Sequence, residues 1–386
     1  MAGLTDLFVD TIRETSETQL GGDKGYLNLV QLPHYTSAFL MGGRTPEEMF
    51  RTSQTIRKTL YLSEENVGQR FGGAGLRMDF QNVQIGTKVT TQMSYYANHI
   101  AWDEVEIDLN ADSDMGREAI RARFHEIITG KLQNLAQSHA TTFENEKWAA
   151  ADQAAMRTNF TAPMSLPYFI TEQDNGLPLQ ADNTAMTDVL GLAPATYPKW
   201  DNTRVSYGAL GGDDADGGDL IGALIFAAQK THFEPLPIKP EHGVMESAPN
   251  VVFCSNDGLR KVQAAIRAGV DQWGRRELDV AYGLTLGNMV IRNVTTLDSA
   301  ALYKPVSGSA LATEATADLT GPRFWGVSKK AFMPSFMKDR MMKMEKPVNL
   351  TAIGAPNEWV QVCKTYNQLL CWDRSKSFIV SPSTDL

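Results

Sequence analysis

The sequence predicts an α+β fold, and three patterns along the chain indicate it. Two β-type stretches, 85–100 and 102–110, lead into a helical stretch from about 113 to 150. Helix and strand patterns then alternate between 219 and 297, and strand-like alternation returns over 357–382. Strands and helices distributed in this way are typical of sheets that pack against helices around a shared core.

Length and composition are those of an ordinary soluble protein with two or three domains. The chain has 386 residues, and single hydrophobic cores stop growing at about 250–300 residues. Its hydrophobic content of 42% and charged content of 21% are unexceptional. The net charge of −9 excludes a protein that binds DNA over its whole surface and permits only local basic patches.

The stretch from 113 to 150 predicts one helix of unusual length. At 1.5 Å per residue it spans roughly 50 Å, whereas typical globular helices have about 8–20 residues. Such a helix, preceded by a ribbon that is marginal by itself, needs a surface larger than one small core. We therefore expect a subunit that finishes folding against copies of itself. The predicted buried stripe follows helical spacing: Ile120, Phe124, Ile128, Leu132, Leu135, His139 and Phe143.

The regions before and after this helix predict different kinds of structure. Residues 1–48 are polar and predict an extended arm, which ends in a short helix capped by Thr45. A long β-rich excursion follows, with a glycine cluster at its centre. Beyond the long helix, loops rich in proline and glycine lead into a compact α/β or α+β unit over 186–320. The last stretch, 357–382, predicts two antiparallel strands.

No motif supports an enzyme, so we assign no catalytic, cofactor-binding or metal-binding residue. The glycine-rich segment 68–77 lacks the Gly-Lys-Ser/Thr ending of a phosphate loop, and we interpret it as a flexible loop tip. An acidic loop over 213–219 leaves a bound Ca²⁺ as an alternative to a solvated loop. It departs from the EF-hand pattern because Gly212 and Ala223 occupy ligand positions.

Histidines and cysteines predict packing roles. None of the six histidines has metal-ligand spacing, and His139 falls on the apolar stripe of the long helix. The odd number of cysteines, without CxxC spacing, predicts buried free thiols in a reducing compartment: Cys254, Cys363 and Cys371. We find no apolar run of about 18 residues and no signal-peptide pattern.

Basic residues are dense between 323 and 346. They predict a solvated face, with contact to an acidic neighbouring subunit or loose contact with packaged nucleic acid as alternatives. Reading of a DNA groove is not expected, because no recognition-helix module is present. The residues are Arg323, Lys329, Lys330, Lys338, Arg340, Lys343 and Lys346.

The order of these elements resembles the major capsid protein of tailed bacteriophages, which has the Hong Kong 97-like fold. Local phrases are similar too: WDEVEIDLN at 102–110, GLAPATYPKWDN at 191–202, and GAPNEWVQVCKTYNQLLCWDRSKSF at 354–378. The resemblance spans nearly the whole chain. It implies an N-terminal arm (1–48), an extended loop (49–110), a peripheral domain (111–185) with a spine helix (113–150), an axial domain (186–320) and C-terminal strands of the peripheral domain (321–386).

The resemblance also implies function and partners. Hexamers and pentamers would form an icosahedral shell around double-stranded DNA, assembled in the bacterial host cytoplasm and retained in the virion. Expected partners are a scaffolding protein, a portal, decoration or cement proteins, and DNA held by non-specific contact, with no membrane and no cofactor. Some members cross-link through a lysine of the extended loop. Lys58 and Lys88 lie there, and we assign neither a catalytic role.

Two alternatives remain open from the sequence. An encapsulin-type nanocompartment has the same architecture, but such shells are usually shorter, and the long arm favours the virus. A two-domain soluble enzyme with a site built from loops over 174–218 is the less favoured alternative.

Overall fold

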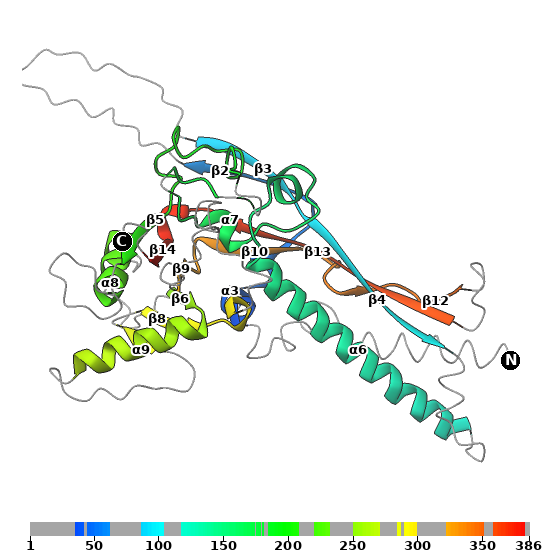
Figure 1. The fold of residues 1–386 in the computed structure, drawn as a ribbon. Coiled ribbons are helices and arrows are strands. Elements are labelled where there is room, and N and C mark those ends of the chain that lie inside the picture. The colour runs from blue at the N-terminus through cyan, green and yellow to red at the C-terminus, as the bar shows by residue number, and fades with distance from the viewer. Residues whose placement is uncertain are drawn as a thin grey trace, which may run out of the picture.

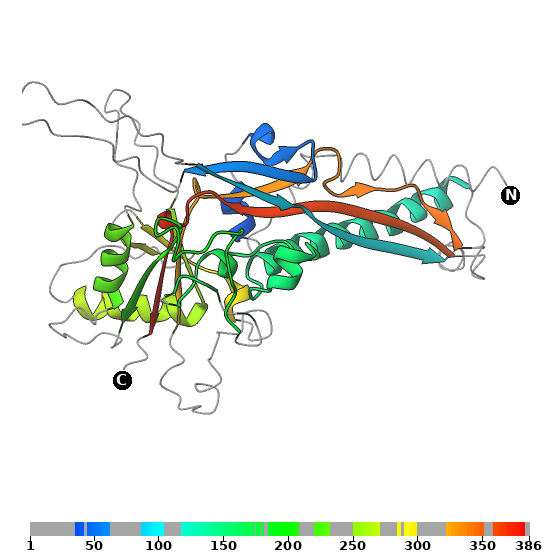
Figure 2. The ribbon, with the colours of Figure 1, turned by 90° about the horizontal axis from the view of Figure 1, so that it is seen from above.

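The computed structural model describes residues 35–41, 45–61, 86–103, 117–173, 175–178, 180, 184–207, 220–231, 250–270, 284–286, 289–298, 322–350 and 358–382. Within these residues the chain is elongated. A long helix and a ribbon of strands extend away from a compact unit that carries helices α8 and α9 (Figure 1). The view from above shows the same division (Figure 2). The mixed α+β class predicted from the sequence is confirmed.

The long helix is α6, Arg117–Lys147, and it lies within the predicted range. Its side chains at helical spacing are buried from Ile128 to Phe143, as the stripe requires. Gly130 is exposed, and an added Cβ there would meet no atom within 4 Å. No other backbone of the described residues therefore approaches the helix closely at Gly130.

The ribbon beside α6 belongs to the first sheet. Strand β4, Ser94–Asp103, pairs antiparallel with β13, Glu358–Cys371, from Ser94 opposite Asn367 to Asp103 opposite Glu358. The other edge of β13 pairs in turn with β10 (Phe332–Met337), β11 (Lys343–Met344) and β12 (Val348–Asn349), while β1 (Phe50–Arg51) lies parallel to β10. Apolar residues of β4 and β10 pack with those of α6 in one core.

The extended-loop hairpin is a separate two-stranded sheet. It pairs β2, Thr55–Tyr61, with β3, Gly86–Gln92. The sequence predicted one strand over 85–100, but the chain leaves this sheet at Met93, which is buried, and enters the first sheet as β4. The change of sheet occurs because Met93 turns into a small core with Ile56 and Leu370. The glycine cluster lies outside the described residues.

The compact unit is built on the second sheet, in the order β5-β14-β9-β6-β8-β7. Side chains of its strands alternate between two cores: Val251 and Phe253 of β6 face one, and Val252 and Cys254 face the other. Helices α8 and α9 cover the second face. The bounds are β5 Thr203–Tyr207, α8 Leu220–Lys230, β6 Asn250–Cys254, α9 Asn256–Val270, β7 Leu284–Leu286, β8 Met289–Asn293, β9 Phe324–Ser328 and β14 Phe378–Pro382.

The C-terminal strands correct one prediction. We expected 357–382 to form two antiparallel strands that pair, but β13 belongs to the first sheet and β14 to the second. A 3₁₀ turn, Arg374–Lys376, separates them and redirects the chain. Strands β9 and β14 also place parts of the range 321–386 in the sheet of the compact unit, beyond the expected boundary at 320. The division of the chain into domains remains a prediction.

Short helices complete the described structure. They are α3 (Tyr35–Met41), α4 (Pro46–Met49), a π-helical turn (Ala154–Thr158), α7 (Leu166–Phe169) and a 3₁₀ turn (Thr295–Asp298). The Ser255 hydroxyl caps α9 by accepting a hydrogen bond from the Gly258 amide at 3.2 Å. The neighbouring Asn256 amide donates to the Asp298 carboxylate at 2.8 Å.

Candidate assembly surfaces

Helix α3, the described part of the predicted arm, is fixed to the C-terminal end of α6. The Glu144 carboxylate accepts hydrogen bonds from the Thr36 amide (3.0 Å), the Ser37 amide (2.8 Å) and the Ser37 hydroxyl (2.7 Å). The Trp148 indole donates to the Thr36 hydroxyl at 2.9 Å. A carboxylate at the first turn of a helix satisfies amides that have no partner within the helix. The end of the arm is thus held by charge-assisted hydrogen bonds.

A buried lysine completes this attachment. Lys147 donates to the Ser37 hydroxyl and to the Phe143 carbonyl, both at 2.7 Å. Burial lowers the pKa of Lys147, while the nearby carboxylates of Glu144 and Glu146 oppose that shift. Burial raises the pKa of Glu146, opposed by a hydrogen bond from Asn367 and by the charge of Lys147. Neighbouring charges of opposite sign therefore allow these groups to be buried together.

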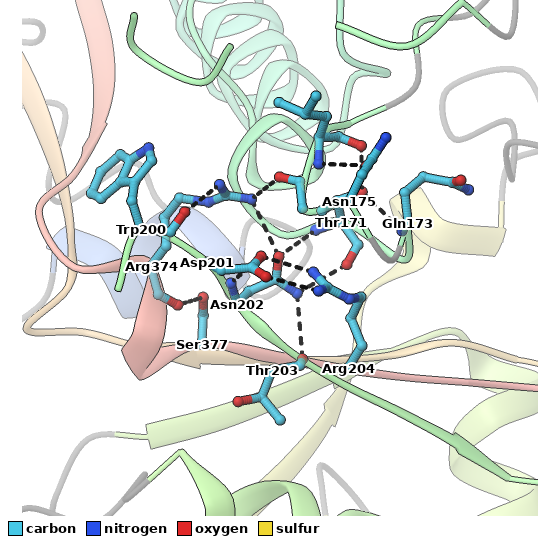
Figure 3. Close-up of polar contacts among 12 residues, drawn as sticks. Thr171, Gln173, Asn175, Trp200, Asp201, Asn202, Thr203, Arg204, Arg374 and Ser377 are labelled. Carbon is cyan, nitrogen blue, oxygen red and sulfur yellow. Dashed lines mark hydrogen bonds and ion pairs between the residues drawn. The ribbon is translucent and has the colours of Figure 1, made fainter. Parts of the chain in front are cut away.

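Arg374 holds the corner between the two sheets (Figure 3). Its guanidinium is buried and donates to three backbone carbonyls: Phe169 at 2.6 Å, Trp200 at 3.0 Å and Gly176 at 3.0 Å. It also donates to the Asn202 side-chain oxygen at 3.3 Å. Burial lowers the pKa of Arg374 to about 10, so it remains a cation at neutral pH.

This arginine was not found by sequence reasoning. The segments that it joins are far apart in the chain, and the adjacent sequence Asp373-Arg374-Ser375-Lys376 reads as an exposed turn. Only Gly176, with a φ of +70°, hints that the loop backbone takes an unusual path. The arrangement fixes Thr171, Gly176 and residues 200–202 against the chain segment that links β13 to β14. Arg374 is therefore a structural cation.

His139 lies on the buried stripe of α6, as predicted, but its ring lacks the hydrogen bonds that a buried histidine usually makes. It is fully buried, with Tyr96 and Phe143 packed edge-on against its ring at centroid distances of 4.8 and 5.7 Å. Neither ring nitrogen has a hydrogen-bond partner in the described part of the chain. Burial lowers the pKa of His139 to about 4, so the ring is neutral at pH 7.

The two lysines of the extended loop are placed differently. The Lys58 ammonium lies 3.7 Å from the ring centroid of Trp372, a cation–π contact between the hairpin and the first sheet. Burial lowers the pKa of Lys58, and the nearby Arg51 cation lowers it further. Lys88 is exposed and lines a groove along β3.

The basic residues between 323 and 346 do not form one face. Arg323 pairs with the carboxylate of Glu172 and is mostly buried. Lys330, Lys338, Lys343 and Lys346 are exposed, and they follow different strands of both sheets. The lysines are thus solvated one by one rather than as the single face that we expected. Any contact with nucleic acid remains a proposal.

Large apolar side chains are exposed at three places. Ile225 and Phe226 are adjacent on α8, with 40% and 55% of their surface exposed. Tyr95 lies on the β4–β13 ribbon and Val348 on β12. Such side chains become buried when another molecule covers them. Among the described residues, these exposed side chains lie on the compact unit and on the first sheet.

In the described ranges, cysteine, histidine and acidic side chains do not cluster into one candidate site. The three cysteines are free and buried there, as predicted, and burial raises the pKa of each thiol, that of Cys363 to about 12. No group of three His, Cys, Asp or Glu side chains is arranged to hold a metal ion within the described residues. The acidic loop over 213–219 lies outside them. None of the helices described has the length and apolar character needed to cross a membrane.

Comparison with known proteins shows which structures this architecture resembles. No protein-family profile matches the sequence, and no curated protein is detectably similar to it. A chain of the "Cyanophage A-1(L) capsid asymmetric unit" superposes with a TM-score of 0.54 at 14% identity, over 92% of this chain and 94% of that one. Lower TM-scores are found for chains of the Cyanophage P-SCSP1u capsid (0.44, 12% identity, 87% and 85% covered) and Mycobacterium phage Adephagia (0.45, 11% identity, 90% and 91% covered). Over most of its length, this chain therefore shares the fold of the matched cyanophage A-1(L) capsid chain.

Proposed function

We propose that this chain is the major capsid protein of a tailed bacteriophage. Subunits would form hexamers and pentamers that close an icosahedral head around the double-stranded DNA genome. The observation that carries the proposal is the fold shared with a capsid chain of cyanophage A-1(L) over 92% of this chain. This fold places a long helix and ribbon outside the compact unit, and such extended elements are suited to cover neighbouring subunits.

The internal chemistry supports a structural role. The buried ionisable groups of the described residues fix segments to one another: Glu144 and Lys147 hold α3, and Arg374 holds the corner between the sheets. A subunit of a closed shell needs segments that are held in fixed positions relative to one another. We propose no catalytic activity and no cofactor for the chain.

The expected partners belong to the same proposal. They are a scaffolding protein during assembly in the host cytoplasm, a portal, decoration or cement proteins, and packaged DNA held by non-specific contact. Exposed lysines such as Lys338 and Lys343 offer charge for a DNA contact of that kind, which would weaken with salt. The arm, extended loop, peripheral domain and axial domain are the proposed divisions of the subunit.

Electron microscopy of the expressed full-length protein, alone and with a co-expressed scaffolding protein, is the direct test. We expect closed shells. Nuclease-protected double-stranded DNA in particles purified from infected cells distinguishes a phage head from an encapsulin-type compartment with protein cargo. Small discrete oligomers at high protein concentration, with and without the scaffolding protein, would contradict the proposal and favour the two-domain enzyme.

A further inference from the structure

Two basic side chains lie where the extended-loop hairpin packs on the first sheet: Arg51 of β1 and Lys58 of β2. Phe336 of β10 packs against α6, so its neighbour Met337 points to the opposite face of the sheet. On that face, Met337 packs against the small core that contains Ile56 of the hairpin. Arg51 is the partner of Met337 in the parallel β1–β10 pair and therefore points to the same face, toward the hairpin.

The Arg51 side chain extends along β10 over Ser335. Its Nη2 lies 3.9 Å from the Sδ of Met333, which is on the same face as Met337 but two strand positions of that face further along. Ser335 lies between these two methionines and is fully buried. A thioether sulfur is a weak acceptor, and it is the only acceptor that the guanidinium reaches among the described residues. The guanidinium and the Ser335 hydroxyl thus lie together without a strong acceptor.

Three buried donor atoms of this layer have no hydrogen-bond partner in the described part of the chain. They are Nε of Arg51, the hydroxyl of Ser335 and the indole Nε1 of Trp372. Trp372 belongs to the layer because it follows Leu370, the partner of Met333 in the β10–β13 pair, by two residues. Buried polar atoms of native proteins are almost always paired, so three unpaired donors in one layer indicate an acceptor that these residues do not supply.

Lys58 adds a second positive charge to the layer. Its ammonium lies 3.7 Å from the ring centroid of Trp372. The Arg51 cation is close enough to lower the pKa of Lys58 beyond the effect of burial, and no carboxylate of the described residues offsets that shift. Neither cation forms an ion pair with a described carboxylate. Two like charges are therefore held near each other without a counter-charge from the described chain.

The chemistry of these groups favours an anion over a water molecule. Arginine, lysine and tryptophan side chains donate hydrogen bonds and cannot accept them. A water molecule among them would leave its own hydrogens with few acceptors, because the nearby sulfur of Met333 is a weak one. An anion accepts from several donors at once, and it also reduces the repulsion between Arg51 and Lys58.

We propose that Arg51, Ser335 and Trp372 form a binding site for a small inorganic anion, of the size of chloride, between the extended-loop hairpin and the first sheet. The three side chains donate to the anion, and the charge of Lys58 holds the hairpin strand β2 toward it. A single-atom anion suits the site better than phosphate or sulfate, because protein already covers the donor atoms. The site stabilises the position of the hairpin within one subunit and does not depend on the proposed shell function.

The test measures the thermal unfolding midpoint of the full-length protein while sodium chloride replaces sodium gluconate, a bulky anion, at constant ionic strength. Arg51→Met is compared with Arg57→Met, which removes the same charge from an exposed residue on the other face of β2. We expect chloride to raise the midpoint of wild type and Arg57→Met by about 2 °C or more, because a ligand that binds only the folded state stabilises it. Arg51→Met should not respond, and general effects of the salts cancel in the comparison.

Ser335→Ala provides a second variant, which removes one donor and keeps both charges. It should need about tenfold more chloride for the same midpoint shift, and it should broaden the chloride NMR line less than wild type does at equal concentration. Parallel chloride responses of Arg51→Met and Arg57→Met overturn the site. Equal line broadening by Ser335→Ala and wild type also overturns it, and this result decides the matter if Arg51→Met does not fold. A wild-type midpoint that does not change with chloride means that water satisfies the three donors, and it overturns the anion.

Discussion

His139 is the residue at which pH acts most directly on the described core. Its ring has no hydrogen-bond partner there, and Tyr96 and Phe143 pack against it. The pKa of about 4 in the folded chain is below the ordinary value of 6.5, so the unfolded chain binds more protons between these values. The stabilisation from the neutral ring is complete above pH 6.5 and is lost as pH falls toward 4.

We therefore predict that wild-type protein loses free energy of unfolding between pH 7 and pH 4.5 relative to His139→Phe. The difference should be on the order of 2–3 kcal/mol, because each pKa unit corresponds to about 1.4 kcal/mol. Phenylalanine keeps an aromatic ring at this site and removes the titration. Urea unfolding of both proteins across this range measures the difference, in which the contributions of other groups cancel. Parallel pH profiles would contradict the assignment.

Arg374 is the residue whose loss should destabilise the chain most among the described charged groups. Arg374→Ala removes the donor to three buried carbonyls, while the Asn202 side-chain oxygen keeps only the hydrogen bond from the Thr171 amide. We expect a loss of about 3–5 kcal/mol, since removing one partner from a buried polar network is strongly destabilising. The matched control is Arg204→Ala. Arg204 is 20% exposed and donates to both carboxylate oxygens of Asp201 three residues away, so we expect a smaller loss of about 1–3 kcal/mol.

Urea unfolding at pH 7 measures both arginine variants. Arg374→Lys is informative as well, because it keeps the charge but cannot reproduce the planar set of donors, and it should remain clearly destabilised. Similar midpoints for Arg374→Ala and Arg204→Ala would mean that the corner between the sheets does not depend on the guanidinium.

At the scale of elements, two glycines test how helix α6 and the second sheet are built. Gly130 lies on the exposed side of α6 with open space around it, so Gly130→Ala should stabilise by up to about 1 kcal/mol through helix propensity. Gly326 of β9 faces the ring of Phe378 in β14, and an added Cβ would lie 2.3 Å from that ring. Gly326→Ala should destabilise by about 1–3 kcal/mol.

Thermal unfolding of the two Gly→Ala variants should therefore give midpoint shifts of opposite sign. Combining Gly326→Ala with Phe378→Leu provides the control, because a smaller side chain opposite the new methyl should recover part of the loss. Additive effects in this double variant would show that the close contact between β9 and β14 is not the cause.

At the scale of the whole molecule, the proposed shell function requires the expected extended loop to contact other copies. Under the proposed function, deleting residues 66–80 should leave a soluble subunit that assembles poorly, because the loop would no longer reach its neighbour. Far-ultraviolet circular dichroism and urea unfolding report on the subunit, and electron microscopy reports on assembly. Normal shells from the deletion variant would remove the proposed bridging role.

The sequence by itself determined the elements with strong periodicity. The stripe of α6 from Ile128 to Phe143 follows from apolar spacing, because spacing reports which face of an element is buried. The odd number of cysteines without CxxC spacing likewise predicted the buried free thiols. The order of the elements was enough to suggest the capsid fold.

Only the tertiary structure decided which elements meet. Apolar alternation predicts that β13 and β14 are strands, but they lie in different sheets. Alternation shows which face of a strand is buried and does not show which strand pairs with it. Arg374 was missed for the same reason. Its role depends on carbonyls of Phe169, Gly176 and Trp200, which lie far away in the chain. Such long-range contacts leave no local pattern, so they emerge only when the chain is folded.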